Sequence, residues 1–102
     1  MIIVAGHLEL EQDDRDTFVA DSVTAVELAR ATPGCLDFSV SADPLDPTRV
    51  NILERWETAE ALLAFRGNGP DDGIADRIVE FHLDEYDVVL ARLPQEFSGD
   101  EG

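Results

Sequence analysis

The sequence predicts one α+β domain in which helices cover one face of a four-stranded antiparallel sheet. Residues 36–42 alternate apolar and polar side chains, which is typical of a strand with one buried face. Residues 50–56 repeat the alternation, and a helical spacing replaces it after Trp56. A chain of 102 residues can bury only a modest core. We therefore expect one domain over residues 1–95 and a disordered acidic tail over residues 96–102.

The first third of the chain is predicted to form a strand and then a helix. Residues 2–10 place apolar side chains on both faces of a strand. Asp13 or Asp14 is a suitable N-cap for a helix that runs to about residue 31, where Thr32-Pro33-Gly34 ends it. The expected buried stripe of this helix consists of Phe18, Val19, Ser22, Val26 and Ala29.

The middle of the chain is predicted to form a hairpin and a second helix. Pro44 and Pro47 cannot continue a strand ladder, so the chain turns between the two alternating segments. Thr58 is a good N-cap for the helix that follows, and Gly67 ends that helix. The expected buried face of the first hairpin strand consists of Leu36, Phe38, Val40 and Ala42.

The last third is predicted to form a short helix and a final strand. Residues 71 to about 81 place Ile74, Ile78 and Phe81 on one side of a helix, and a strand runs from about residue 84 to residue 91. The complete βαββαβ order is the ferredoxin-like arrangement. Because such a sheet has helices on one face only, its other face needs a cover.

The charge of the chain excludes two classes of partner. Asp and Glu number 23 against 7 basic residues, all of them Arg, which gives a net charge of −16. A field of this sign repels phosphate groups, so we expect no nucleic-acid partner and no anionic membrane partner. A single cysteine, Cys35, suits a reducing compartment, and no signal peptide is recognisable at the N-terminus. We expect a cytoplasmic protein in which Cys35 is a packing residue rather than a nucleophile.

Two short motifs indicate a family. The Pro33-Gly34-Cys35 turn and the sequence Glu54-Arg55-Trp56-Glu57-Thr58 before the second helix resemble the antibiotic biosynthesis monooxygenase family of dimeric αβ-barrel proteins. The resemblance extends over nearly the whole chain. It implies a homodimer that packs sheet against sheet, with a pocket between each sheet and its helices. The superfamily also includes haem-degrading enzymes, isomerase-like members and proteins without a shown activity.

Strand parity selects the first candidates for that pocket. Alternate residues of a strand point the same way, so Glu54 lines the pocket if Trp56 does. Desolvation would raise the pKa of Glu54 and make it a general base. The alternative is a structural ion pair with an arginine or a place in the dimer seam. Trp56 is either a stacking wall for an aromatic ligand or a plain core residue.

The two histidines and two further residues complete the candidate set. We expect His7 to line the pocket as a proton-transfer or hydrogen-bonding group. His7 and His82 lack the short spacing of typical metal ligands, so we expect no metal site and place His82 at the surface or an interface. Tyr86 and Arg77 are further pocket candidates, with merely structural roles as the alternative.

The resemblance, taken together with these residues, implies a monooxygenase that needs no cofactor and acts on a quinol or another hydroxyaromatic substrate. In this hypothesis the ring is held by Trp56, Phe38, Phe65 and Tyr86. Glu54 or His7 removes a proton and Arg77 stabilises the developing anion. The alternative is a non-catalytic dimeric protein of the same fold that binds a small ligand or serves a stress response. A haem-degrading enzyme comes third: the resemblance to that branch implies an axial histidine on the third helix, and the third predicted helix of this chain has none.

The acidic composition generates a prediction about salt. We expect the melting temperature to stay nearly flat from about 0.02 to 2 M NaCl, because most carboxylates of a soluble acidic surface are already solvated. Thermal unfolding followed by circular dichroism checks it. A steep rise with salt would instead indicate adaptation to a saline environment, in which screening relieves self-repulsion.

Overall fold

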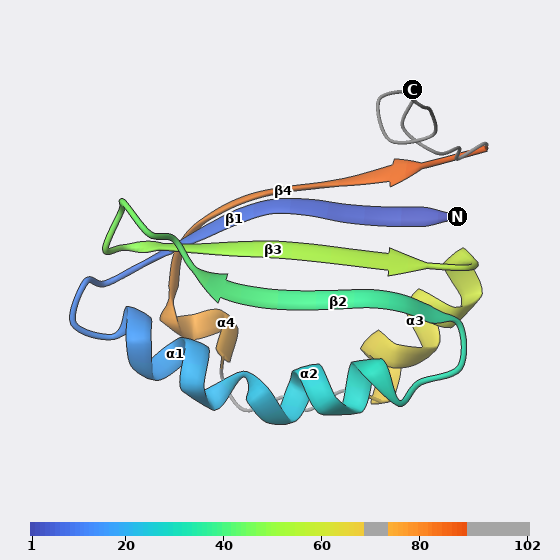
Figure 1. Ribbon diagram of the computed structural model, residues 1–102, viewed down its shortest axis with the longest axis horizontal. Coiled ribbons are helices and arrows are strands. Elements are labelled where there is room, and N and C mark those ends of the chain that lie inside the picture. Colours follow the sequence, from blue (N-terminus) through green and yellow to red (C-terminus); the bar gives the residue numbers. More distant parts are fainter. Residues whose placement is uncertain (69–73, 90–102) are drawn as a thin grey trace, which may run out of the picture.

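A computed structural model describes residues 1–68 and 74–89 of the chain. The elements along the chain are β1 (Ile2–Leu10), α1 (Arg15–Asp21), α2 (Val23–Arg30), β2 (Cys35–Ala42), β3 (Arg49–Trp56), α3 (Ala59–Asn68), α4 (Ile74–Arg77) and β4 (Ile78–Asp87). Their arrangement is shown in Figure 1.

The four strands form one antiparallel sheet in the order β2-β3-β1-β4, which is the predicted ferredoxin-like topology. Helices α1 and α2 follow one another along one side of the sheet, α3 lies by the end of β3, and α4 lies at the opposite end (Figure 1). In the described part of the chain, no helix combines the length and the apolar character that crossing a membrane requires.

The core lies between the sheet and the helices and has two clusters. One consists of Val4, Ala29, Phe38, Trp56 and Leu62. The other consists of Leu8, Leu10, Phe18 and Val50. Strand β1 contributes to both clusters from one face, as expected from its alternation. Trp56 and Val50 of β3 are both 0% exposed, so β3 contributes a fully buried side chain to each cluster.

The helix signals in the sequence are confirmed in part. The N–H of Ala61 donates to Oγ1 of Thr58 at 3.1 Å, so Thr58 caps α3 as predicted. The predicted first helix is instead divided into α1 and α2 at Ser22. The Ser22 hydroxyl is buried and donates to the carbonyl oxygen of Val19 at 2.7 Å. Such a bond gives a serine a local alternative to helical pairing.

A bulge changes the expected face of β2. The pairing with β3 shifts between Cys35 and Asp37, which removes Leu36 from the alternation. Leu36 is 44% exposed, so its predicted place on the buried face is wrong. Cys35 packs against the first core cluster in its stead. Burial raises the pKa of the Cys35 thiol, which fits the expected packing role.

The last third of the chain differs most from the prediction. Where described, the expected helix is only the four residues of α4, and β4 begins at Ile78 rather than near residue 84. Phe81 belongs to β4 because a ladder with β1 runs along the whole strand. Residues 69–73 and 90–102, which include the start of that helix, the end of the expected strand and the expected tail, lie outside the described residues.

Close contact between β1 and β4 depends on Gly6. This residue has φ of 145°, a conformation that residues with a side chain rarely adopt. A Cβ at this position would collide with the backbone carbonyl of His82 on β4. Gly6 therefore lets the two strands pair without a break in the middle of the ladder.

We predict that Gly6→Ala lowers the free energy of unfolding by about 2 kcal/mol or more, because it adds backbone strain and a collision with β4. Gly67→Ala is the matched control, since a Cβ there meets nothing within 4 Å and Gly67 lies in α3. The control should stabilise by up to about 1 kcal/mol through helix propensity. Urea unfolding measures both changes. Equal effects of the two substitutions would contradict the special role of Gly6.

Candidate functional site

Strand β3 presents Glu54 to the helix-covered face of the sheet. Glu54 pairs in register with Val4 of β1 and with Phe38 of β2, both of which are core residues. It lies two positions before the buried Trp56 on the same strand face. The parity predicted for Glu54 and Trp56 is therefore confirmed.

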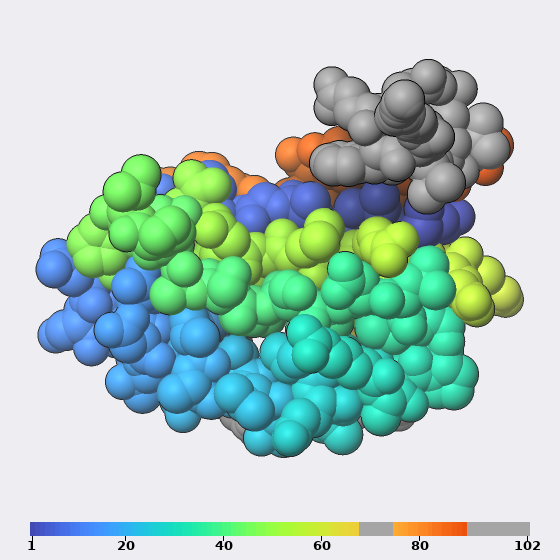
Figure 2. Space-filling model, viewed as in Figure 1, coloured from blue at the N-terminus to red at the C-terminus, as the bar shows by residue number. Residues whose placement is uncertain are grey.

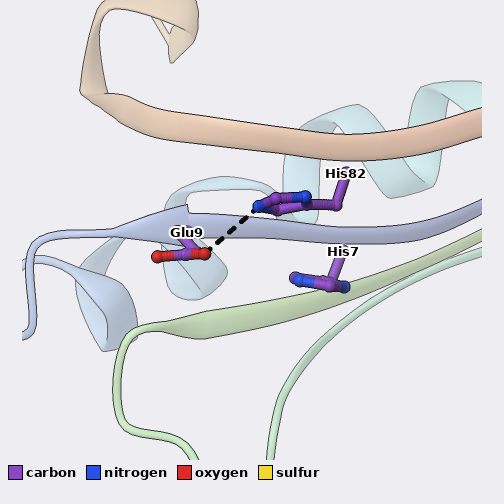
Figure 3. A group of neighbouring side chains, drawn as sticks. All are labelled: His7, Glu9 and His82. Carbon is purple, nitrogen blue, oxygen red and sulfur yellow. Dashed lines mark hydrogen bonds and ion pairs between the residues drawn. The ribbon is translucent and has the colours of Figure 1, made fainter.

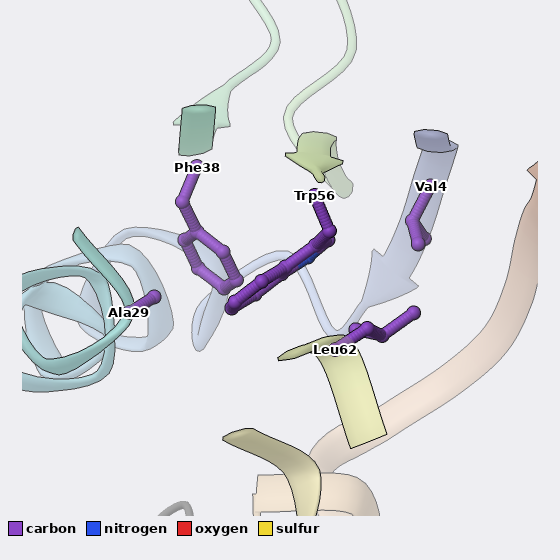
Figure 4. Close-up of a cluster of buried hydrophobic side chains, with 5 residues drawn as sticks. All are labelled: Val4, Ala29, Phe38, Trp56 and Leu62. Atoms are coloured by element: carbon purple, nitrogen blue, oxygen red, sulfur yellow. The ribbon is translucent and has the colours of Figure 1, made fainter. Parts of the chain in front are cut away.

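Three aromatic residues pack together beside Glu54. The ring of Trp56 lies 5.4 Å from that of Phe65 and 6.4 Å from that of Phe38 between centroids. Phe38 and Phe65 are 5.6 Å apart in an edge-to-face arrangement. Figure 4 shows Phe38 and Trp56 descending from neighbouring strands into the core, with Leu62 below Trp56. The structure thus brings together three of the four residues predicted to hold a ring.

The burial of these rings changes their expected roles. Trp56 and Phe38 are buried, so neither has a free face on which a ligand could stack in this conformation. The alternative of a plain core aromatic therefore describes Trp56 better than a stacking wall does. Phe65 is only half-buried, so of the three rings it is the one with exposed surface that a ligand could contact.

Trp56 instead holds Glu54. Its indole Nε1 donates a hydrogen bond to Oε1 of Glu54 at 3.0 Å. Burial raises the pKa of Glu54, and the bond from Trp56 and the charge of Arg66 offset only part of that rise. The result is a carboxylate of increased basicity in a fixed orientation, which is the property required of a general base.

Arg66 and Glu85 join this site although sequence analysis did not select them. Arg66 of α3 forms an ion pair with Glu85 of β4 at 2.6 Å, and both side chains are about half exposed. Glu85 pairs in register with Val4, whose other neighbour is Glu54. The alternation of Phe81, Leu83 and Glu85 is the signal that would have placed Glu85 on this face, had the strand been assigned from residue 78.

Within residues 1–68 and 74–89, two hollows beside the helices bear on this site. The one beside Phe65 has a volume of about 330 Å³ and a mostly apolar lining made by Leu28, Thr32, Pro33, Ala64 and Phe65. A larger one of about 470 Å³ lies between α2 and β2, where the helices and β2 do not close completely against each other (Figure 2). Glu54 lines neither of them. Phe65 is the link between the first hollow and the residues around Glu54.

Arg77 lies away from this group, so the structure does not bring it to the residues that it was expected to assist as an anion stabiliser. Its guanidinium binds both carboxylate oxygens of Asp14 at 2.7 and 2.9 Å and contacts Asp21 at 3.0 Å. It also lies 5.3 Å from the ring centroid of Phe18. The hydrogen bonds from Arg77 lower the pKa of Asp14. Arg77 thus joins α4 to α1, at the end of the sheet opposite α3 (Figure 1).

His7 and Tyr86 lie on the sheet face without helices, so their expected place in the pocket is wrong. His7 pairs in register with His82, and Ile3 pairs with Tyr86. Strand alternation puts these residues opposite the core residues Val4 and Leu8 of β1. The chain has no other histidine. Haem ligation from the helix side therefore has no imidazole to use.

Comparisons with known proteins agree with this geometry. The family model for antibiotic biosynthesis monooxygenase matches residues 1–70. A protein of Synechocystis sp., itself named as uncharacterised, is 33% identical over 61 residues, which make up 60% of this chain and 42% of that protein. The chain thus spans less than half the length of this curated relative.

Solved structures of proteins named provisionally as antibiotic biosynthesis monooxygenases share the fold. The one from Deinococcus radiodurans has a TM-score of 0.75 at 19% identity and covers 94% of this chain and 100% of its own. The one from Chloroflexus aurantiacus has a TM-score of 0.66 at 25% identity and covers 89% and 95%. The family match spans more than half of the chain, and the topology agrees with it. The chain therefore belongs to the antibiotic biosynthesis monooxygenase family.

Proposed function

We propose that this chain is a monooxygenase that needs no cofactor and acts on a quinol or another hydroxyaromatic substrate, with Glu54 as its general base. One observation carries the proposal. A half-buried carboxylate with a raised pKa lies on the helix side of the sheet and is oriented by a buried indole N–H. Membership of the family supports the class of reaction.

In the proposed chemistry the substrate supplies the electrons. Oε1 of Glu54 accepts the bond from Trp56, so Oε2 takes the phenolic proton. The resulting anion attacks O2 through a ring carbon that carries hydrogen and forms a peroxide, which recovers a proton from Glu54. Loss of water from the peroxide leaves a carbonyl group. One oxygen atom enters the product and the other leaves as water, so no external reductant is required.

The neighbouring residues divide the remaining tasks. Phe65 receives the ring at the edge of the apolar hollow, and the hydroxyl must extend past Phe65 toward Trp56 to reach Glu54, because Glu54 does not line the hollow itself. Arg66, half exposed and near enough to lower the pKa of Glu54, replaces Arg77 as the cation that stabilises the developing anion. Trp56 acts as a positioning residue, because its buried indole reaches Glu54 and not the hollow.

One observation favours the alternative of a ligand-binding protein. The hollow beside Phe65 is apolar and Glu54 does not line it, so the hollow could hold a ligand without any chemistry. Activity measurements separate the two functions, because only the oxygenase consumes O2.

We predict that Glu54→Gln lowers the rate of O2 uptake with an anthrol-like substrate by about 10²–10⁴-fold and leaves substrate binding nearly unchanged, because it removes the base alone. Glu57→Gln, an exposed carboxylate just after β3, is the matched control and should keep full activity. An oxygen electrode measures the rates. Because burial raises the pKa of Glu54, the wild-type rate should fall on acidification at a higher pH than an ordinary carboxyl would give.

Two results would contradict this proposal. Full activity of Glu54→Gln would remove Glu54 as the base. The absence of O2 uptake above the uncatalysed rate with every hydroxyaromatic compound tried would leave the ligand-binding alternative.

We also propose that the face of the sheet without helices pairs with a second copy of the chain. Its side chains include Ile3, Leu53 and Tyr86, the last two being 38% and 51% exposed. An open apolar sheet face of this kind is typical of an interface. The family resemblance implies that the same sheet face of a second copy covers this one.

Light scattering at micromolar concentration should therefore give twice the chain mass of 11.2 kDa. Leu53→Glu should yield monomers, because it places a charge in the middle of the apolar part of the face. Leu63→Glu is the matched control, since Leu63 is 61% exposed on α3 and should leave the dimer intact. A wild-type protein that runs as a monomer overturns the proposal.

A further inference from the structure

Both histidines of the chain meet on the sheet face without helices. His7 of β1 and His82 of β4 are register partners, and their rings stack with centroids 4.6 Å apart and an interplanar angle of 24°. Glu9 follows His7 by two positions on the same face of β1. Residues far apart in sequence are thus held together by two hydrogen-bonded strands, which are rigid supports for a site.

The potential ligand atoms of the three residues converge. One ring nitrogen from each histidine and one carboxylate oxygen of Glu9 all lie within 4.8 Å of one another. Figure 3 shows both imidazole rings directed toward the carboxylate of Glu9. The distance from Nε2 of His82 to Oε2 of Glu9 is 3.2 Å. Two ligand atoms on one tetrahedral zinc ion, with bonds of about 2.0–2.1 Å, are separated by about 3.3 Å.

We propose that His7, Glu9 and His82 bind a divalent transition-metal ion of the zinc type. Two imidazoles and one carboxylate suit zinc, whereas calcium and magnesium prefer oxygen ligands alone. Three protein ligands leave a fourth position open for water or for a group from another molecule.

A second carboxylate strengthens the argument. Oε1 of Glu80 lies 2.9 Å from Nε2 of His82, so this nitrogen faces oxygens of both Glu80 and Glu9. A ring nitrogen carries at most one hydrogen and cannot fully satisfy two carboxylates. A divalent cation between them offsets both negative charges. The net charge of −16 attracts cations to the whole surface and adds to this preference.

This site is independent of the proposed oxygenase chemistry. Glu54 lies on the helix-covered face of β3, whereas His7, Glu9 and His82 lie on the opposite face of the sheet. Removal of the metal should therefore leave O2 uptake unchanged, and loss of O2 uptake says nothing against the metal site.

The test is titration of the full chain, freed of metal by a chelator, with Zn²⁺ in a calorimeter and with Co²⁺ in a visible spectrometer. We expect one ion per chain and the intense visible bands of four-coordinate Co²⁺. His82→Ala and Glu9→Gln should each weaken binding at least tenfold, because each removes a ligand. Asp84→Asn is the matched control, since Asp84 lies on the same face of β4, in register with Ala5, and should bind as the wild type does.

The melting temperature keeps the result interpretable for variants that lose stability. Zinc should raise the melting temperature of the wild type and of Asp84→Asn, because it binds preferentially to the folded state. It should not raise the melting temperature of His82→Ala. Three outcomes would overturn the proposal: no binding by the wild type, equal binding by the ligand variants, or an equal loss in Asp84→Asn. The last would indicate diffuse attraction of cations to the acidic surface rather than coordination.

Discussion

The pairing of β1 with β3 on one side and β4 on the other determines the chemistry of each face of the sheet. Side chains alternate along each strand, so register partners share a face across all the strands. Val4 and its register partners lie on the face of the sheet that carries the helices, where burial raises the pKa of Glu54. His7 and its register partners Asn51 and His82 lie on the opposite face, which carries no helices. The collision that a side chain at Gly6 would cause shows how closely β1 and β4 must approach for this division to hold.

The sequence predicts most of this fold because its strongest signals are local. The alternation in residues 2–10 and 50–56 and the cap at Thr58 depend on near neighbours, and the structure agrees with them. The start of β4 could not be predicted in the same way. Ile78 and Phe81 fit a helical spacing, and only the ladder with β1, which is distant in sequence, selects the strand. The bulge that exposes Leu36 also depends on a partner strand.

The same difference between local signals and contacts with distant segments applies to the residues of the two sites. Parity within one strand correctly joined Glu54 to Trp56. It could not show that Arg66 reaches Glu85 from another element, nor that His7 faces away from the helices, because both facts require the strand order. The residue types alone favoured Arg77 as a functional cation. Its actual partners are Asp14 and Asp21, so Arg77 forms ion pairs that connect α4 to α1.

The uncovered face poses a physical conflict that the proposed metal site would relieve. If two copies meet there, the apolar Ile3 and Leu53 favour contact, but the carboxylates of Glu9 and Glu80 bring like charges together. Arg49 of β3 is the register partner of Glu9 on this face, but it also contacts Asp43 and Asn51, so it offsets only part of the negative charge. A divalent ion held by the histidines adds two positive charges where the repulsion arises. Metal binding and dimer formation, though argued from different observations, would then favour each other on the same surface.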